Sequence, residues 1–157
     1  LAELERLPPP SRWPTILAWS ILLLILLGCA YGIAMSPDLG WDLVLTWVFI
    51  TGGLSAFGTI LAAGHPLTVV SAFLAAPMTT LNPSIGAGMI TGAVELYLRK
   101  PSVGDFSRLR ADVASWRGWW RNRVSRIFLV FLLSSLGAAI GTYLASFQIV
   151  KRLFAAG

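Results

Sequence analysis

The feature that most constrains this chain is a long stretch without basic side chains. No lysine or arginine occurs between Arg12 and Arg99, so the 86 positions from 13 to 98 lack them. Over the whole chain of 157 residues, 56% are hydrophobic and only 12% are charged. Water-soluble domains seldom have this balance, whereas a membrane protein needs it because lipid surrounds it. The sequence therefore predicts an all-α integral membrane protein. Residues 13–157 are expected to form one transmembrane helical domain, and residues 1–12 a linker from a missing N-terminal domain.

The positions of the basic residues predict how the chain is oriented. Eight of the twelve lysines and arginines fall between Arg99 and Arg126, two precede residue 13 and two follow residue 150. Such clustering is typical of a membrane topology signal, so no nucleic-acid partner is expected despite the net charge of +5. With a cytoplasmic N-terminus, ten basic residues lie inside and two outside. We therefore predict a multi-pass protein of the cell membrane with its N-terminus in the cytoplasm and the lipid bilayer as a partner.

Three segments are long and apolar enough to cross a bilayer as helices. They are residues 13–35, 43–63 and 124–150. At ~1.5 Å per residue each is about 30 Å long or more, which matches the hydrocarbon core. A loop at 36–42 is expected between the first two, and Lys151 and Arg152 are expected to end the third.

Residues 64–98 are also apolar, but they are interrupted. Pro66 and Pro77 bracket a first piece, and Asn82-Pro83-Ser84 opens a second piece that ends at Leu98. As a helix the second piece is about 22 Å long, too short to span the core. Irregular backbone survives in lipid only when protein buries it or water reaches it. We therefore predict a broken helical hairpin over 64–98 that returns to its starting side, surrounded by the three spanning helices. The charge count supports this independently, because a single crossing would place the N-terminal arm and the eight-charge region on opposite sides.

An amphipathic helix is expected at 102–120. Ser102 and Asp105 form an Asp variant of the capping box, and apolar residues follow at helical spacing. We expect this helix to lie in the membrane interface; the alternative is a cytoplasmic loop helix with a solvated charged face. The residues expected at the lipid headgroups, there and in the adjoining residues up to 126, are Arg117, Trp119, Trp120, Arg121, Arg123 and Arg126.

Pairs of small residues predict close helix packing. Such residues let helix backbones approach in a membrane, either within one chain or between copies. The positions are Gly28, Gly32, Gly88, Gly92, Gly137 and Gly141. A homo-oligomer through these faces, with a dimer favoured, is part of the prediction.

Two ionisable residues within the hairpin are candidates for a polar site. Glu95 follows Gly88 and Gly92 on one helical face. A carboxylate inside a membrane is costly to place there, so it is a candidate functional residue. The structural alternative, which we favour, pairs it with Arg99 at i+4. His65 is a candidate for proton transfer or metal binding, but a cap at the helix break is the favoured interpretation.

The hairpin junction supplies the rest of the candidate intramembrane site. Its polar residues are Thr79, Thr80, Asn82 and Ser84. Asn82 before Pro83 is typical of a helix N-cap, and half-helices ending inside a membrane line substrate sites in channels and transporters. A buried turn that merely packs is the favoured alternative. No catalytic residue, metal site or cofactor is predicted, and the substrate is unknown.

Several phrases resemble the C-terminal membrane region of the TraB/PrgY family, the pheromone shutdown proteins. They cover Gly64 to about Ala145 in the family's order, roughly half of the chain. The phrases are Gly64-His65-Pro66-Leu67-Thr68, Ala75-Ala76-Pro77 to Leu81-Asn82-Pro83, Glu95 with Leu98-Arg99-Lys100-Pro101, Val103-x-Asp105-Phe106, Asn122-Arg123-x-x-Arg126-Ile127, and Leu136-Gly137 to Ile140-Gly141-Thr142. The resemblance implies a membrane domain that follows an N-terminal TraB domain related to a group of predicted metal-dependent peptidases. Enterococcal members are linked to limiting a peptide pheromone, which favours an external N-terminus, against the charge count.

The leading functional prediction is a transmembrane anchoring and oligomerisation domain of a TraB/PrgY-like protein whose peptidase-related domain is absent from this sequence. The alternative is a transporter or channel-like module with a polar cavity at the broken hairpin. An intramembrane peptidase with a metal on His65 and Glu95 ranks below both, because a third ligand is not evident.

Overall fold

The computed structural model describes residues 12–81 and 85–156, and these residues form seven helices and no strand. The helices are α1 (Trp13–Met35), α2 (Pro37–Leu61), α3 (Pro66–Thr80), α4 (Ala87–Arg99), α5 (Val103–Asp112), α6 (Gly118–Arg121) and α7 (Arg123–Ala156). The predicted all-α class is therefore confirmed. The 1–12 linker and the polar residues Asn82 and Ser84 lie outside the described residues, apart from Arg12.

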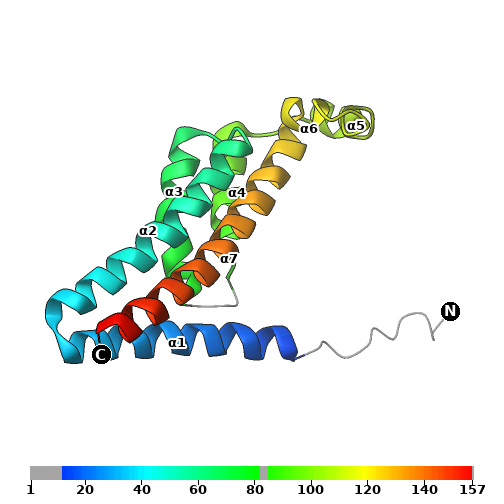
Figure 1. Cartoon of the computed structure of the whole chain (residues 1–157). Helices are drawn as coiled ribbons and strands as arrows, with labels where there is room; N and C mark the ends of the chain where they lie inside the picture. The colour runs from blue at the N-terminus through cyan, green and yellow to red at the C-terminus, as the bar shows by residue number, and fades with distance from the viewer. Residues whose placement is uncertain (1–11, 82–84, 157) are drawn as a thin grey trace, which may run out of the picture.

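The helices α2 and α7 form the central pair of the molecule. Figure 1 shows them running side by side, with α3 and α4 along one side and α1 crossing their lower end. Glycines permit this close approach, since a Cβ on Gly58 would overlap the Leu133 carbonyl and one on Gly137 would overlap the Leu54 carbonyl. The predicted small-residue stripe of the last helix thus packs within the chain.

The connection between the first two helices is much shorter than predicted. The expected loop at 36–42 is wrong, because α1 ends at Met35 and α2 begins at Pro37. Ser36 is the N-cap of α2, and its hydroxyl oxygen accepts a hydrogen bond from the Leu39 amide at 3.2 Å. A serine cap followed by proline is a strong helix start, so these residues begin a helix rather than form an extended turn.

The stretch 64–98 contains two separate helices, α3 and α4, but their bounds differ from those predicted. Pro77 lies inside α3, which continues to Thr80, and α4 begins at Ala87 with Gly86 as its N-cap. Pro77 has no amide hydrogen and therefore leaves the Phe73 carbonyl without its usual helical donor. That carbonyl faces Gly52 of α2, where an added Cβ would lie only 2.6 Å from it. Because Gly52 has no side chain, α2 can lie close to α3 at the point where Pro77 removes a helical hydrogen bond.

The prediction that the spanning helices surround this pair is wrong. The outer face of α3 is exposed along its whole length, at Leu67, Val70, Leu74 and Met78. Its buried face consists of smaller residues, Thr68, Ala72, Ala75, Ala76, Pro77 and Thr79. The pair therefore lies at the edge of the bundle. The small residues of α3 pack inside the bundle, and the large apolar side chains of α3 are exposed on the outside of the protein.

The predicted amphipathic helix at 102–120 is two helices, α5 and α6. The backbone turns sharply at 113–117, where the Ser115 amide donates to the Asp112 carbonyl and the Gly118 amide donates to the Ser115 carbonyl. This turn brings the backbone of Gly118 so close to the Asp112 carbonyl that a Cβ at position 118 would overlap it. Glycine at this position therefore allows the turn that interrupts the predicted helix. The predicted capping box is present: the Asp105 carboxylate accepts from the amide and the hydroxyl of Ser102, each at 2.8 Å.

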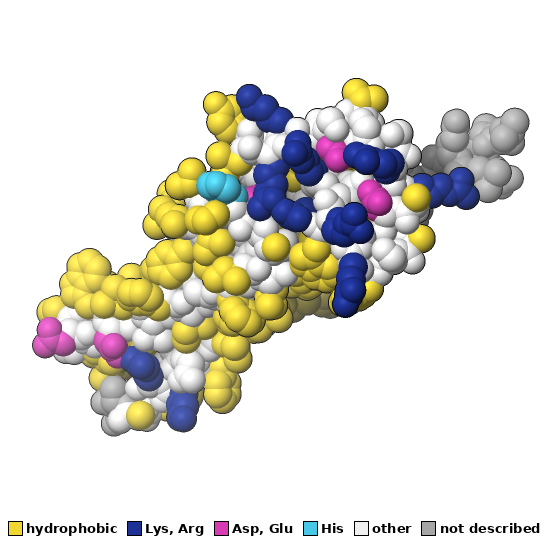
Figure 2. Space-filling view, turned by 90° about the horizontal axis from the view of Figure 1, so that it is seen from above, with side chains coloured by type: hydrophobic (Ala, Val, Ile, Leu, Met, Phe, Trp, Pro, Cys, Tyr) yellow, Lys and Arg dark blue, Asp and Glu magenta, His cyan; other side chains and the backbone are white. Residues whose placement is uncertain are grey.

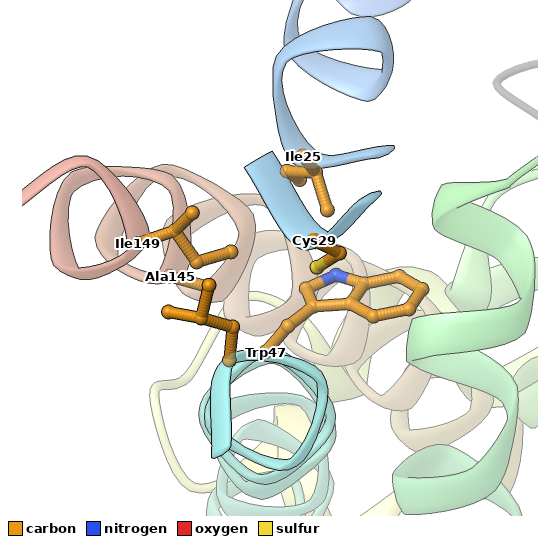
Figure 3. Packing of buried hydrophobic residues seen from close by; sticks show 6 residues of the cluster. Ile25, Cys29, Trp47, Ala145 and Ile149 are labelled. Carbon is orange, nitrogen blue, oxygen red and sulfur yellow. The ribbon is translucent and has the colours of Figure 1, made fainter. Parts of the chain in front are cut away.

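The last helix is longer than predicted, because α7 continues past Lys151 and Arg152 to Ala156. Arg152 forms an ion pair with Asp42 of α2. Leu153 packs against the apolar core around Ile25, Cys29, Trp47, Ala145 and Ile149, which Figure 3 shows from close by. These contacts with α1 and α2 hold the extra turns in helical form, so the two basic residues do not end the helix.

Candidate functional site

A fully buried carboxylate lies where α2, α3 and α4 meet. Glu95, on α4, has no solvent exposure. Its Oε2 accepts a hydrogen bond from the His65 amide at 2.9 Å and another from the Thr68 hydroxyl at 2.6 Å. Its Oε1 pairs with the Arg99 guanidinium one turn later. A buried charge is tolerated only when it is paired and hydrogen-bonded, and both conditions are met here.

Arg99 extends this cluster to the end of α2. Its Nη2 donates to the Ala63 carbonyl at 3.0 Å. Ala63 has a positive φ of 54° directly after the end of α2, a backbone conformation that is uncommon for a residue with a side chain. One carboxylate and one guanidinium therefore hold the strained turn between α2 and α3 against α4. The predicted i+4 pair of Glu95 and Arg99 is present, and it does more than stabilise a single helix.

His65 caps α3, as the structural interpretation predicted. Its Nδ1 accepts a hydrogen bond from the Leu67 amide at 3.2 Å. The Glu95 carboxylate lies at the same helix N-terminus, where a negative charge is favoured by the helix dipole. In the described part of the chain no three His, Cys, Asp or Glu side chains converge as metal ligands do. The hydrogen bonds of His65 and Glu95 position and stabilise the start of α3.

The predicted polar site is divided between two places. His65 and Glu95 lie at the start of α3, whereas Thr79 and Thr80 lie at its end, where both hydroxyls donate to the Ala76 carbonyl. Thr79 and Thr80 line a pocket of about 260 Å³ between α1, α7 and the facing ends of α3 and α4. Ser135, Thr142 and Tyr143 of α7 also line it. Two separate environments thus replace one continuous polar cavity.

A hydroxyl network links α2, α4 and α7 between these two places. The Thr91 and Ser134 hydroxyls lie 2.7 Å apart, and the Ser55 hydroxyl donates to the Ser134 carbonyl at 3.1 Å. All three residues are buried. Sequence reasoning assigned Ser134 only to the small-residue packing face of the last helix and did not predict the network. Thr91 precedes Glu95 by four residues and so shares its helical face.

The predicted packing glycines all have partners within this chain. Gly28 faces Ile149, and Gly32 faces Leu43. Gly88 and Gly92 face Phe131, while Gly137 and Gly141 face Leu54 and Thr51. These surfaces are therefore occupied inside one protomer, and self-association would have to use others.

Half of the predicted headgroup residues are engaged within the protein. The Trp119 indole donates to the Val113 carbonyl at 3.1 Å, and the Trp120 indole donates to the Leu61 carbonyl at 2.9 Å. Arg126 donates to the Trp120 carbonyl, with its Nε at 2.7 Å. These three side chains join α6 to the end of α5, to the end of α2 and to the start of α7. By contrast, Arg117, Arg121 and Arg123 are exposed.

Asn122 is a key residue that the sequence analysis named only within a family motif, without predicting its role. Its Oδ1 accepts from the Val124 amide at 2.9 Å and so caps α7, while its Nδ2 donates to the Asp105 carbonyl and the Asp112 carboxylate, each at 2.8 Å. It is almost fully buried. An asparagine directly before a long apolar helix is a recognisable N-cap signal, but its contacts with α5 depend on the turn at 113–117.

Comparison with known proteins identifies a family for this chain. The model of the family "TraB family protein, C-terminal domain" matches residues 13–154. A relative is the uncharacterized protein MJ1365 of Methanocaldococcus jannaschii, which is 39% identical over 110 residues. This match covers 69% of the chain but only 28% of the relative. No solved structure matches the chain. The family match extends over nearly the whole chain, including the first two helices, and the chain belongs to the TraB family through that family's C-terminal domain.

Proposed function

We propose that this domain anchors a TraB-family protein in the membrane and holds the rest of that protein at the membrane surface. Three helices are long and apolar enough to cross a bilayer, Thr15–Met35, Pro37–Leu61 and Arg123–Ala155. Most residues of each remain uncovered by the protein itself, as expected where lipid is the solvent. The M. jannaschii relative is several times longer than its matched segment, so there the same domain adjoins a large remainder.

The distribution of charge between the two ends of the molecule carries this proposal. The basic residues of Arg99–Arg126 lie on the end of α4, on α5 and α6, and at the start of α7, at the same end as the α2–α3 turn (Figure 1). The connection between α1 and α2 and the C-terminus of α7 lie at the other end. We place the basic end in the cytoplasm of a cell-membrane protein. The proposal of a cytoplasmic N-terminus rests on the count of lysines and arginines alone, because α1 lies across the lower end of α2 and α7 in Figure 1, away from the basic end.

In this orientation α3 and α4 form a re-entrant hairpin. Glu95, near the end of α4, contacts His65 and Thr68 at the start of α3, so the two helices run in opposite directions and begin and end at the basic end. As helices of 15 and 13 residues they reach only about 20 Å, less than the ~30 Å core. The pair enters the membrane without crossing it.

Cysteine labelling tests this topology. In a Cys29→Ser background, single substitutions Asp38→Cys, Ser107→Cys and Leu81→Cys are introduced and intact cells are treated with a membrane-impermeant maleimide. We expect labelling at 38 from outside, and at 107 only after permeabilisation. Position 81, at the end of α3, should be protected in intact cells. External labelling at 107, or equal labelling at 38 and 107, would contradict the orientation.

Anchoring itself is measured by extraction of membranes with alkaline carbonate. The domain, fused through its N-terminus to a soluble reporter, should stay in the pellet and keep the reporter there. A reporter without the domain provides the control and should be released. Release of the fusion at high pH would reject the role of membrane anchor.

The proposal includes self-association as a dimer, through surfaces other than the glycine faces. The N-terminal half of α1 is the best candidate, because its large side chains, among them Ile16, Leu17 and Trp19, are exposed. In the Cys29→Ser background, Leu17→Cys should form a disulfide between two copies in mild oxidant. Tyr97→Cys, on exposed α4, should not. Equal cross-linking at both positions, or none at 17, would contradict a specific dimer through α1.

A second candidate function is transport of a small solute, and the pocket at the ends of α3 and α4 favours it. Four hydroxyl-bearing residues besides Tyr143 line its mainly apolar wall, namely Thr79, Thr80, Ser135 and Thr142. Flux of ions or small solutes through protein-containing liposomes tests this function. Ala139→Trp should block flux by filling the pocket if the pathway exists, whereas Tyr97→Phe should not affect it.

A further inference from the structure

We propose that α5, α6 and the first turn of α7 form a surface that binds the headgroups of anionic phospholipids in preference to zwitterionic ones. This headgroup surface consists of Arg108, Arg110, Arg117, Arg121 and Arg123 with the apolar residues Val103, Phe106 and Trp116. The inference rests on the proposed membrane location of the domain and adds a lipid preference to it.

The five arginines carry charge that is only partly balanced within the protein. The pKa of the Asp105 carboxyl is lowered by hydrogen bonds from Ser102 and, less strongly, by the charges of Arg123 and Arg108. All five are exposed, and none forms an ion pair with a carboxylate in the part of the chain that the structure describes. The two carboxylates of this region are hydrogen-bonded internally, Asp105 to Ser102 and Asp112 to Asn122. A guanidinium presents paired donors that match the oxygens of a phosphate group. Arg108 Nε donates to the Gly104 carbonyl at 3.2 Å. A phospholipid phosphate would be bound by the other guanidinium donors of this surface.

Large apolar side chains stand beside these arginines. Val103, Phe106 and Trp116 are 87%, 57% and 80% exposed. The Trp116 ring packs against Trp120, with centroids 5.3 Å apart, and Trp120 donates to the last turn of α2 at Leu61. Trp116 therefore lies level with the end of a membrane helix, the depth at which tryptophan is favoured in a bilayer. Acidic protein or nucleic acid would not reach both the arginines and this apolar layer at that depth.

The surface is held in a fixed position beside the bundle. Figure 1 shows α6 adjoining the start of α7, with α5 displaced sideways from the bundle. Asn122 joins α5 to the start of α7 through Asp105 and Asp112. Because the backbone is already ordered, the arginines do not require folding on contact with lipid, and this lowers the entropic cost of binding.

The opposite end of the molecule lacks this property and provides the control. There Arg152 of α7 is paired with Asp42, and Asp38 is a further acidic residue in the first turn of α2. Figure 2 shows the Lys and Arg side chains gathered at the end of the molecule that faces the viewer, with a small mixed group of both signs at the far end. The positive electrostatic field that would attract anionic lipid is therefore concentrated at the end formed by α5, α6 and the start of α7.

Lipid binding to the purified full chain tests the proposal. The protein in a neutral detergent is titrated with phosphatidylglycerol or phosphatidylcholine, and bound lipid is counted by native mass spectrometry at two salt concentrations. We expect a clear preference for phosphatidylglycerol that weakens with salt. The triple variant Arg117→Gln, Arg121→Gln, Arg123→Gln should lose it by about 100-fold, since each basic residue contributes about fivefold near an anionic surface.

Two further variants make the test decisive. The corresponding triple Arg→Lys variant keeps the charge and should retain most of the preference. Lys151→Gln with Arg152→Gln, at the other end, should leave it unchanged. Equal binding of both lipids, an unchanged Gln variant, or preferential binding of an acidic peptide or oligonucleotide would overturn the proposal. A wild-type protein that remains in the carbonate pellet but shows no lipid preference would refute only this inference, whereas release of the wild-type protein from the pellet would refute the anchor.

Discussion

The Glu95 carboxylate accepts a 2.6 Å hydrogen bond from the hydroxyl of Thr68, which lies 27 residues earlier on another helix. The same oxygen accepts from the His65 amide, and the other oxygen pairs with Arg99. An acidic side chain of α4 thus completes the N-terminus of α3. This relationship explains how two short helices that individually bury little surface can keep a defined arrangement.

Replacing Glu95 with Gln should destabilise the protein. The amide can still accept from Thr68, but Arg99 loses its counterion, and removal of one partner of a buried pair costs about 3 kcal/mol. The measurement is the free energy of unfolding in detergent. Asp42→Asn, which breaks the exposed pair with Arg152, should cost less than about 1 kcal/mol. Equal effects of the two substitutions would show that burial does not strengthen the Glu95 pair.

Two glycines of α2 should respond differently to alanine. A Cβ on Gly58 would overlap the Leu133 carbonyl of α7, whereas nothing lies within 4 Å of a Cβ on Gly53. Gly58→Ala should therefore separate the central helix pair and cost roughly 1–3 kcal/mol of stability. Gly53→Ala should leave stability unchanged or raise it slightly, because alanine favours the helix. Thermal unfolding midpoints compare them, and a larger loss for Gly53→Ala would argue against this packing of α2 on α7.

Substitutions of Asn122 should separate its two roles. Asn122→Ala removes both the cap of α7 and the contacts with α5, and should cost about 1–2 kcal/mol. Asn122→Asp keeps an oxygen for the Val124 amide but places a carboxylate beside Asp112. Amide hydrogen exchange should then show loss of protection in α5 with the start of α7 retained. Faster exchange at Val124 in the Asp variant would mean that the cap is not independent of α5.

The start of α5 should loosen in acid. Hydrogen bonds from the Ser102 amide and hydroxyl hold the pKa of Asp105 below its usual value. A depressed pKa means that the stabilising contribution is complete above the unfolded-state pKa of ~3.9 and is lost as the pH falls from there through the folded-state pKa. The protection of the α5 amides, expressed as the ratio of the intrinsic to the observed exchange rate, should therefore fall below about pH 4. In Asp105→Asn the protection should be low and independent of pH over this range. A variant that keeps the wild-type pH profile of protection would exclude Asp105 as the responsible group.

Local signals in the sequence correctly predicted several features of the structure. The capping box of Ser102 and Asp105, the His65 cap and the Glu95–Arg99 pair each involve residues within four positions of one another, so helical periodicity is sufficient to place them. The same local reasoning failed where neighbours decide the outcome. Pro77 does not end α3 because Gly52 leaves room beside the freed Phe73 carbonyl, and Lys151 does not end α7 because the following turn packs on α1.

The sequence by itself determined the fold class, a helical protein with segments suited to a membrane. Its long apolar segments and its clustered arginines can be read directly from the order of residues, without knowledge of any tertiary contact. Only the tertiary structure decided which polar groups meet. Thr68 with Glu95, Asn122 with Asp112, and Trp120 with Leu61 come from different helices or across a sharp turn. Their meeting depends on how helix faces pack and where the backbone reverses, and helical periodicity specifies a face without specifying its partner.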